Sequence, residues 1–417
     1  MMVNRLSPRM LNLGLRSLSM GGRFLLILSI AKLLAAEEVG MFGLLGTGIG
    51  FSVLLLGLDF YGYANRELLA TPQDQYARIL SYQIVAYFPL YLLFIPLILL
   101  FFIQGILPWQ YAGWFLGLVM VEHISTELNR LLNMMQYPLS ATVVLFLRSS
   151  LWIMVVIPLM MFDTSFRSLE TLLTGWFIGG IVSILYGLFS VKKVIPHWQW
   201  HTPDMAWIRQ GYRTGMLFFA GTISLQAISL LDKFWLEYLS SVKEVGVYVF
   251  YLTLVQGAIG FIHAGLIVFI SPKIVKSFQE GRYTEFNQLL NRFGKELFVA
   301  AVLMGSLILF AMPFVVGWVG REVYLEHYDI LYIMIISGMV MVVSNHPHTF
   351  LYAARKDRYM LFSNISALAV FLLLLWRMKT LSSLLPLYQV SLSFLGTHLW
   401  ILSVKTAGYL YYRKQFE

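Results

Sequence analysis

Long stretches without any charged side chain constrain the fold of this chain more than any other feature. The run from Ile79 to Val121 has no charge at all, and further runs occupy 39–58, 171–191, 245–272, 297–320, 330–354, 359–376 and 380–404. A helix that crosses a bilayer needs ~20 mainly apolar residues. Because 59% of the residues are hydrophobic and only 12% are charged, the chain is expected to be an integral membrane protein.

The apolar runs also predict how many helices the chain forms. The first run is too long for one helix, and the sequence QGILPWQ at 104–110 supplies the Gly and Pro of a turn in its middle. Lightly charged candidates at 10–34, 139–162 and 214–236 complete the set. We therefore expect an all-α polytopic protein with about 12 transmembrane helices.

The distribution of Lys and Arg predicts the orientation in the membrane. The loops on the side of the N-terminus carry about four times as many basic residues as the opposite loops, which indicates that both termini are cytoplasmic. The net charge of +9 then reflects loops that face anionic lipid. No soluble domain is left that could bind nucleic acid, so nucleic acid is not an expected partner.

A short sequence pattern occurs twice, about half the chain length apart. Residues 35–45 read AAEEVGMFGLL and residues 240–250 read SSVKEVGVYVF, so the two copies share Glu-Val-Gly at Glu38 and Glu244. Six predicted helices lie between the copies and return the chain to the same side, which is typical of a parallel repeat. So short an identity can also arise by chance. If it marks a duplication, the chain forms two six-helix lobes, 1–191 and 213–417, joined by a cytoplasmic linker at 192–212.

Several basic residues fall inside or at the ends of the predicted spans: Arg16, Arg23, Lys32, Arg148 and Lys233. A charge at the bilayer centre costs ~2.5–3.5 kcal/mol on insertion scales, so each must face water, a partner or the interface. Arg16 and Arg23 are seven residues apart and share one helix face, which suggests a cavity lining. Arg16 and Lys32 could instead extend to the two membrane surfaces, but Arg23 is too central for that.

A second polar stripe lies on the predicted fourth helix. His123, Glu127 and Arg130 are spaced four and three residues apart and so share a face, with Glu122 beside them. Glu127 and Arg130 could simply neutralise each other within the helix. Glu122, His123 and Glu127 are candidates for charge compensation or proton coupling.

Glu122 has no opposite charge at a helical spacing, so its partner must come from another helix. Arg23 and Arg148 are the two candidates that the sequence offers. The titratable groups at depth also include His263 and the sequence NHPH at 345–348, for which packing and cavity lining are a better interpretation than metal binding.

Motifs of enzymes are missing from the sequence. It has no cysteine, no GxxxxGK[ST] phosphate loop and no HExxH zinc motif. We therefore expect no catalytic residue, no metal and no cofactor. Transport would draw on the membrane potential, an ion gradient or the gradient of the substrate.

Two segments resemble Wzx-type O-antigen and polysaccharide flippases. These are LLLGLDFYGYANREL at 54–68 and SLLDKFWLEYLSSVKEVGVYVFYLTL at 229–254. The resemblance implies the fold of the multidrug/oligosaccharidyl-lipid/polysaccharide exporter superfamily, with two six-helix lobes around a central cavity. It implies a bacterial inner-membrane flippase that moves an undecaprenyl-diphosphate-linked oligosaccharide to the periplasmic leaflet by alternating access, coupled to an ion gradient. The polysaccharide polymerase and the chain-length regulator would be its partner proteins.

The residues found above fit such a cargo. A diphosphate is a compact polyanion for which Arg offers bidentate donors, so Arg16, Arg23 and Arg148 are the expected diphosphate-binding residues. The remaining candidates are gating residues or tethers between helices: Asp59, Arg66, Arg130, Asp232 and Lys233. Of these, Asp59 and Arg66 match the family pattern directly.

Three other functions are less consistent with the sequence. A multidrug cation antiporter of the same superfamily should place acidic rather than basic residues in its cavity. A lipid II flippase usually has more helices. A glycosyltransferase or glycan polymerase needs a large outside loop, whereas the predicted outside turns are all short.

Overall fold

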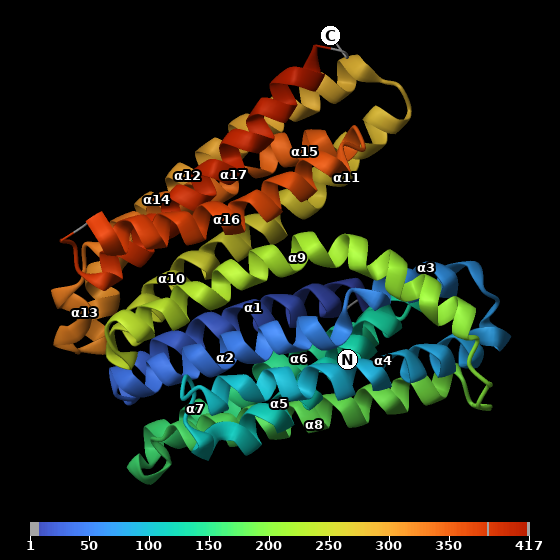
Figure 1. Cartoon of the computed structure of the whole chain (residues 1–417), viewed down its shortest axis with the longest axis horizontal. Coiled ribbons are helices and arrows are strands. Elements are labelled where there is room, and N and C mark those ends of the chain that lie inside the picture. Colours follow the sequence, from blue (N-terminus) through green and yellow to red (C-terminus); the bar gives the residue numbers. More distant parts are fainter. Residues whose placement is uncertain (1–7, 382, 415–417) are drawn as a thin grey trace, which may run out of the picture. The chain divides into compact units, whose positions relative to one another are not determined.

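The computed structural model describes residues 8–381 and 383–414, and all regular secondary structure in them is helical (Figure 1). In chain order the helices are α1 (Pro8–Leu33), α2 (Ala36–Gly57), α3 (Phe60–Ala70), α4 (Tyr76–Ile103), α5 (Ala112–Met134), α6 (Pro138–Phe146), α7 (Trp152–Phe162), α8 (Leu169–Val194), α9 (Met205–Leu239), α10 (Val242–Ile262), α11 (Val268–Gln279), α12 (Tyr283–Val319), α13 (Glu322–Glu326), α14 (Ile330–Val343), α15 (Asn345–Ala353), α16 (Asp357–Leu381) and α17 (Pro386–Arg413). Two π-helical turns, η3 (Leu147–Leu151) and η5 (His263–Ile267), join α6 to α7 and α10 to α11.

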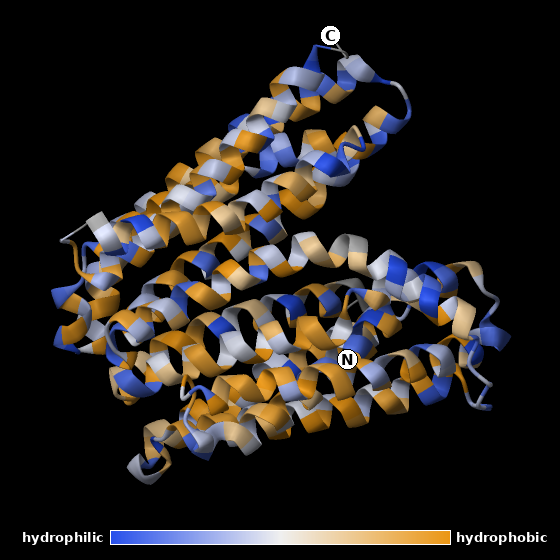
Figure 2. Cartoon of the chain, in the orientation of Figure 1, coloured by the Kyte–Doolittle hydropathy of each residue, from blue (hydrophilic) through white to orange (hydrophobic). Residues whose placement is uncertain are grey.

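The long helices correspond to the predicted spans. Within the described residues, ten helices or continuous helix pairs are long and apolar enough to cross a membrane, and the two parts of α9 make an eleventh. At 23 residues α5 is also long enough, but the acidic residues in its middle make it more polar than the others. Figure 2 shows hydrophobic residues along these helices and hydrophilic ones at their ends and in the loops. The expected all-α, multi-pass membrane protein is confirmed.

Some helices extend beyond the spans predicted from the apolar runs. α12 begins at Tyr283, well before the apolar run at 297, because its first turns are amphipathic and carry an ion pair between Arg292 and Glu296 (2.6 Å). α9 begins inside the predicted linker 192–212, where the Asp204 carboxylate accepts hydrogen bonds from the first backbone N–H groups of the helix. That start brings Trp207 onto Phe60, with ring centroids 5.6 Å apart.

The residue contacts divide the chain into two compact units. Unit 1 holds the described residues up to Leu26 together with Leu45–Phe219, and unit 2 holds Ile27–Leu44 and the described residues from Ala220 onward. The end of α1 and the start of α2 therefore group with the second unit. The predicted lobe limits, 1–191 and 213–417, stay a prediction.

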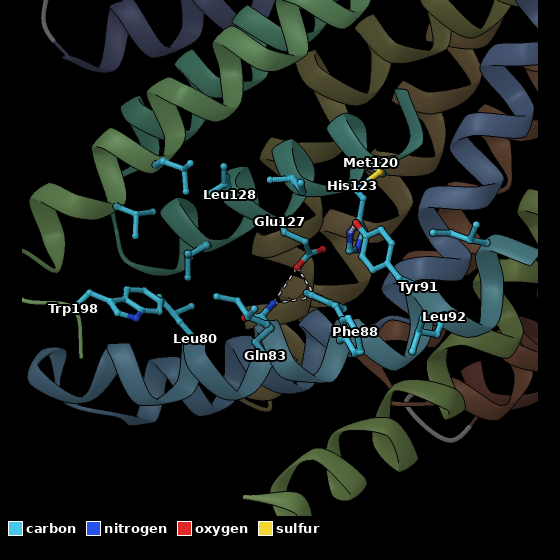
Figure 3. A pocket seen from close by; sticks show the side chains of 17 residues that line it. Leu80, Gln83, Phe88, Tyr91, Leu92, Met120, His123, Glu127, Leu128 and Trp198 are labelled. Carbon is cyan, nitrogen blue, oxygen red and sulfur yellow. Dashed lines mark hydrogen bonds between the residues drawn. The ribbon is translucent and has the colours of Figure 1, made fainter. Parts of the chain in front are cut away.

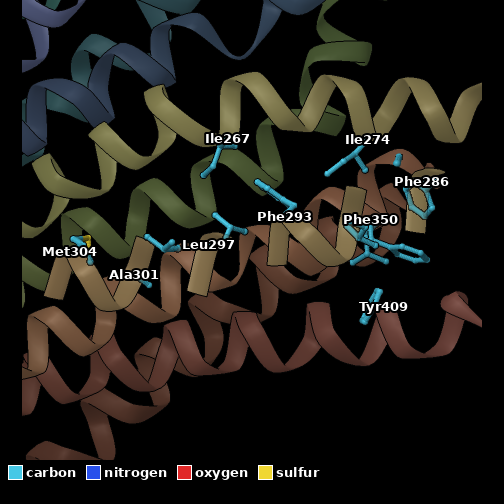
Figure 4. Packing of buried hydrophobic residues seen from close by; sticks show 13 residues of the cluster. Ile267, Ile274, Phe286, Phe293, Leu297, Ala301, Met304, Phe350 and Tyr409 are labelled. Carbon is cyan, nitrogen blue, oxygen red and sulfur yellow. The ribbon is translucent and has the colours of Figure 1, made fainter. Parts of the chain in front are cut away.

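Each unit has its own hydrophobic core. In unit 2 the core lies between α11, α12 and α15, where Phe286, Phe293 and Phe350 are fully buried (Figure 4). In unit 1 a core of aliphatic residues from α4, α5, α6 and α8 includes Leu132 and Ala141. Both cores form because the apolar faces of neighbouring helices are removed from lipid and packed on each other.

The two Glu-Val-Gly copies have a structural role within unit 2. Each Glu lies in the first turn of its helix: Glu38 accepts a hydrogen bond from the backbone N–H of Ala35 (3.2 Å), and the Glu244 N–H donates to the Ser241 hydroxyl (3.3 Å). These are capping contacts of a helix start. The two Gly residues lie against each other, because a Cβ at Gly246 would be 3.2 Å from the backbone nitrogen of Gly40 and would overlap the Ala36 carbonyl. The repeated motif thus starts two helices and lets their backbones touch.

Candidate functional site

The candidate site lies in unit 1 and is built on two faces of α5. Glu122 and Thr126, one helical turn apart, face η3, while His123 and Glu127 face α4. Arg130 lies on the second face, one turn beyond Glu127. The spacing of four and three residues predicted this shared face.

Glu122 is neutralised by Arg148. The Arg148 Nη1 is 3.2 Å from Glu122 Oε2, and the same guanidinium donates a hydrogen bond to the Thr126 hydroxyl. On its other oxygen Glu122 accepts a hydrogen bond from the Trp176 indole of α8 (2.7 Å). Of the two partners open from the sequence, the structure therefore selects Arg148. Arg148 projects from the π-helical turn η3, a local widening that often occurs at functional sites.

α1 packs on the same turn and places Arg23 next to this pair. A Cβ at Gly22 would be 2.8 Å from the Ser150 hydroxyl, and that hydroxyl donates to the Ser19 carbonyl (3.1 Å). Arg148 and Glu122 are the charged groups that act on the Arg23 guanidinium. Arg23 is exposed and forms no hydrogen bond or ion pair with any residue in 8–381 or 383–414.

Arg16 lies two turns before Arg23 on α1. Its Nε is 3.4 Å from the Thr142 hydroxyl of α6, and the side chain is exposed. Glu122 neutralises Arg148, whereas Arg16 and Arg23 form no ion pair with any residue that the structure describes.

Glu127 is the centre of a hydrogen-bond network on the second face of α5, the face toward α4. Its Oε2 accepts hydrogen bonds from the Tyr87 hydroxyl (2.6 Å) and the Gln83 amide (3.0 Å), and its Oε1 pairs with Arg130 (2.7 Å). Arg130 in turn lies over the Tyr61 ring, 3.6 Å from its centroid. The intrahelical pair that was open as an alternative is therefore present, and it forms part of a larger network.

His123 connects this network to a cavity. Its Nδ1 is 2.7 Å from the Tyr91 hydroxyl, while its buried Nε2 has no hydrogen-bond partner among the described residues. The cavity has a volume of about 630 Å³ and is lined by α4, α5, α8 and Trp198 (Figure 3). Its walls are mainly apolar, including Phe88 and Met120, and Glu127 and His123 are among the polar residues that line it. An amphiphilic ligand with an apolar body fits such a lining.

Asp59 lies at the break between α2 and α3. It is 8% exposed and has a left-handed backbone conformation (φ 50°), as does Leu58 (φ 44°). A Cβ at Gly215 would be 2.7 Å from the Leu58 carbonyl, so α9 passes close to this break. Arg66 is exposed on α3. The position of Asp59 within the break favours a structural tether.

Asp232 and Lys233 form a buried pair in unit 2. Asp232 is fully buried, and its carboxylate is 3.0 Å from the Lys233 ammonium and accepts a hydrogen bond from the Tyr248 hydroxyl (3.0 Å). Lys233 also donates to the Ser229 carbonyl (2.8 Å). The pair ties α9 to α10.

Several polar residues of this site were not found from the sequence. Gln83, Tyr87 and Tyr91 lie in the part of α4 that carries no charged residue, yet they recur every fourth position and so share one face. That spacing in an apolar helix was a usable signal. No feature of the sequence, in contrast, indicated that Trp176 belongs to the site. Within the described residues no three His, Cys, Asp or Glu side chains are grouped to hold a metal ion.

Comparison with solved structures identifies the fold. The chain is similar to an inward-facing multidrug resistance MATE family transporter of the MOP superfamily, with a TM-score of 0.77 and 13% identity over 97% of this chain and 98% of that one. It is similar to the lipid II flippase MurJ in an inward closed conformation, with a TM-score of 0.73 and 15% identity over 95% and 87% of the two chains. An outward-facing MATE transporter gives a TM-score of 0.65 at 15% identity over 98% and 94%. No protein-family model and no curated protein matches the sequence. The chain therefore has the two-lobed helical fold found in MATE transporters and in MurJ, a fold that does not single out the Wzx-type flippases.

Proposed function

We propose that this protein is a flippase that moves an undecaprenyl-diphosphate-linked oligosaccharide across the bacterial cytoplasmic membrane by alternating access. The fold shared with transporters and with a lipid II flippase supports this proposal. The observation that carries it is the pair of uncompensated guanidiniums, Arg16 and Arg23, on one exposed face of α1. A polymerase and a chain-length regulator of polysaccharide synthesis would use the exported product.

The spacing of the two arginines suits a diphosphate. Seven residues of α-helix separate them by about 10 Å, and two long side chains can close over one polyanion between them. Each guanidinium offers parallel N–H donors to phosphate oxygens. Arg148 would contact the cargo with its other guanidinium nitrogens, because its Nη1 already pairs with the Glu122 carboxylate.

The charged groups around Glu127 are proposed to serve energy coupling. Glu127 and His123 are ionisable groups that line a cavity, and a change in the charge of Glu127 would alter the bonds to Tyr87, Gln83 and Arg130 together. Glu122, by comparison, compensates the charge of Arg148. Gating roles of Asp59, Arg66, Asp232 and Lys233 remain part of this proposal.

The second candidate function is multidrug cation export. The apolar cavity of about 630 Å³ with Glu127 in its lining favours it, since a lipophilic cation needs an apolar wall and a carboxylate. In the structure, however, Arg130 already pairs with that carboxylate (2.7 Å). A cation would first have to displace Arg130, which makes this the weaker candidate.

The test is transport by Arg23 variants in proteoliposomes that contain an undecaprenyl-diphosphate-linked oligosaccharide. Hydrogen bonds to charged groups are worth about 1.5–3 kcal/mol, so Arg23→Gln should lower the transport rate at least about tenfold. Arg23→Lys should be intermediate, because it keeps the charge but loses the bidentate geometry. Arg167→Gln is the matched control, since Arg167 is exposed and donates to the Met160 carbonyl (2.9 Å) away from the site. Wild-type transport by Arg23→Gln would refute the role of the arginines, and export of cationic dye without lipid transport would favour the second candidate.

A further inference from the structure

A second cavity lies wholly within unit 2, between α11 and α15. Its volume is about 490 Å³, which falls in the range of roughly 300–1,000 Å³ usual for small-ligand sites. The predicted topology places it in the cytoplasmic half of the membrane. No residue of the proposed diphosphate or coupling sites lines it.

The two helices that form this cavity are both interrupted where they meet it. Between α10 and α11 the chain passes through the π-helical turn η5, which begins at His263, and Pro272 follows within α11. On the opposite side α14 ends at Val343 and α15 begins at Asn345. Interruptions of this kind are frequent at functional sites. His263 and Asn345, which lie at these two interruptions, both line the cavity.

Polar atoms in the wall of the cavity are left without partners. The Ser271 hydroxyl and the His348 Nδ1 are buried and form no hydrogen bond with any described residue. The Asn345 amide nitrogen donates to the carbonyls of Met341 (3.0 Å) and Val342 (3.2 Å), and its Oδ1 has no such bond. Unpaired polar groups are costly in a low-dielectric interior. An occupant that both donates and accepts hydrogen bonds would satisfy them.

The two histidines of the NHPH sequence have different surroundings. His346 packs on the Tyr409 ring, with centroids 5.1 Å apart, and touches α12 at Gly294. His348, two residues later, lines the cavity. Only the second histidine is therefore available to a ligand.

The charged side chains in the cavity lining indicate which chemical class of ligand the cavity can bind. Among the described residues, no acidic side chain lines the cavity, so a cation finds no carboxylate, and no arginine lines it, so a diphosphate finds no bidentate donor. The one basic residue, Lys276, is 71% exposed and lies 3.8 Å from the Glu280 carboxylate. What remains is a set of uncharged donors and acceptors with the ring of Tyr352 at the edge. Hydroxyl, amide and imidazole groups beside an aromatic ring match a neutral polyol.

We propose that this cavity binds an uncharged sugar residue of the transported glycan, through Ser271, Asn345 and His348. The inference rests on the proposed flippase function and adds to it a glycan subsite separate from the diphosphate site. Neutral sugars are favoured over uronic acids, because the Glu280 carboxylate already lies 3.8 Å from the ammonium of the lining residue Lys276.

The test measures how much a sugar adds to the binding of a short-chain diphosphate lipid. The full chain in nanodiscs is titrated with citronellyl diphosphate and with the same compound carrying glucose, galactose, N-acetylglucosamine, N-acetylgalactosamine or glucuronic acid. The ratio of the two Kd values is the sugar increment. For the wild type we expect an increment of at least tenfold with one or more of the uncharged sugars and a smaller one with glucuronic acid.

Variants then assign the increment to this cavity. The double variant Ser271→Ala/His348→Leu should reduce the increment to nearly onefold and leave the Kd of the sugar-free compound unchanged. Ser403→Ala is the matched control, because Ser403 is exposed on α17 in the same unit and bonds only its own helix at the Leu399 carbonyl (2.8 Å). Arg23→Gln should give the opposite result, with weaker binding of the sugar-free compound and an unchanged increment.

Each outcome decides between the two proposals. If the sugar-free compound binds but no sugar adds affinity, or if the double variant keeps the full increment, the glycan subsite is wrong and the flippase proposal stands. If neither compound binds the wild type, the flippase proposal fails and the subsite fails with it.

Discussion

Variants of the ion pair between Arg148 and Glu122 can distinguish an effect on stability from an effect on transport. Arg148→Gln removes the cation and leaves the Glu122 carboxylate, whose side chain is 16% exposed, with the Trp176 indole as its remaining donor. At 3.2 Å, two unit charges attract by about 5 kcal/mol at an effective dielectric constant of about 20. Breaking such a buried pair costs about 3–5 kcal/mol, because one charge is left uncompensated.

Removing both charges should cost much less than removing one. In Glu122→Gln/Arg148→Gln the two amides can still bond each other and Trp176, and neutral replacement of a buried pair is often tolerated. We expect the double variant to lie within about 1–2 kcal/mol of the wild type. The single variant should lower the Tm by about 6–12 °C if unit 1 unfolds as one body of some 200 residues.

The assay is thermal unfolding of purified protein, followed by transport of the lipid-linked oligosaccharide in proteoliposomes. Recovery of both stability and transport in the double variant would show that Arg148 serves to neutralise Glu122. A stable double variant that does not transport would assign Arg148 a direct contact with the cargo. The electrostatic reasoning is refuted if Arg148→Gln is as stable as the wild type, or if the double variant is no more stable than the single one.

Two further predictions concern packing in unit 2. Gly246→Ala should destabilise the protein by about 1–3 kcal/mol, because the new Cβ overlaps backbone atoms of α2. Gly265→Ala is the control and should be neutral or slightly stabilising, because the space around its Cα is open. Equal Tm values for the two variants would contradict the close contact at Gly246. Asp232→Ala should cost about 3–5 kcal/mol by leaving the buried Lys233 unpaired. The exposed Glu285, which pairs with Arg282, provides the control, and Glu285→Ala should cost less than about 1 kcal/mol in the same denaturation assay.

The sequence was sufficient to predict an all-helical, multi-pass membrane protein, because a charge-free run of ~20 residues has few alternatives to a membrane helix. It was less informative about helix ends. The first turns of α12 contain Arg292 and Glu296, whose charges resemble a loop in composition but form a pair along one helical face. Amphipathic extensions of this kind cannot be separated from loops by hydropathy alone.

The site could be predicted only along single helices. The common face of His123 and Glu127 follows from helical geometry, so it was accessible from their spacing. The choice of Arg148 over Arg23 as the partner of Glu122 depends on how α1 and η3 pack at Gly22, and that contact joins residues far apart in the chain. A tertiary choice between two chemically equivalent arginines leaves no trace in one sequence.

The limits of the two units have a mechanical consequence for transport. The boundary between them falls inside three helices, at Leu26 of α1, Leu44 of α2 and Phe219 of α9, and α9 is bent by 52° just before Phe219. In the proposed alternating-access cycle, a rearrangement of the units would bend helix backbone at these places. In α2 the bend would fall in the sequence GLLGTGIG at 43–50, where glycines lower the cost of distorting a helix. If the proposed transport function holds, part of the energy of each cycle would be stored as elastic strain in these helices, and the turnover rate should depend on their stiffness.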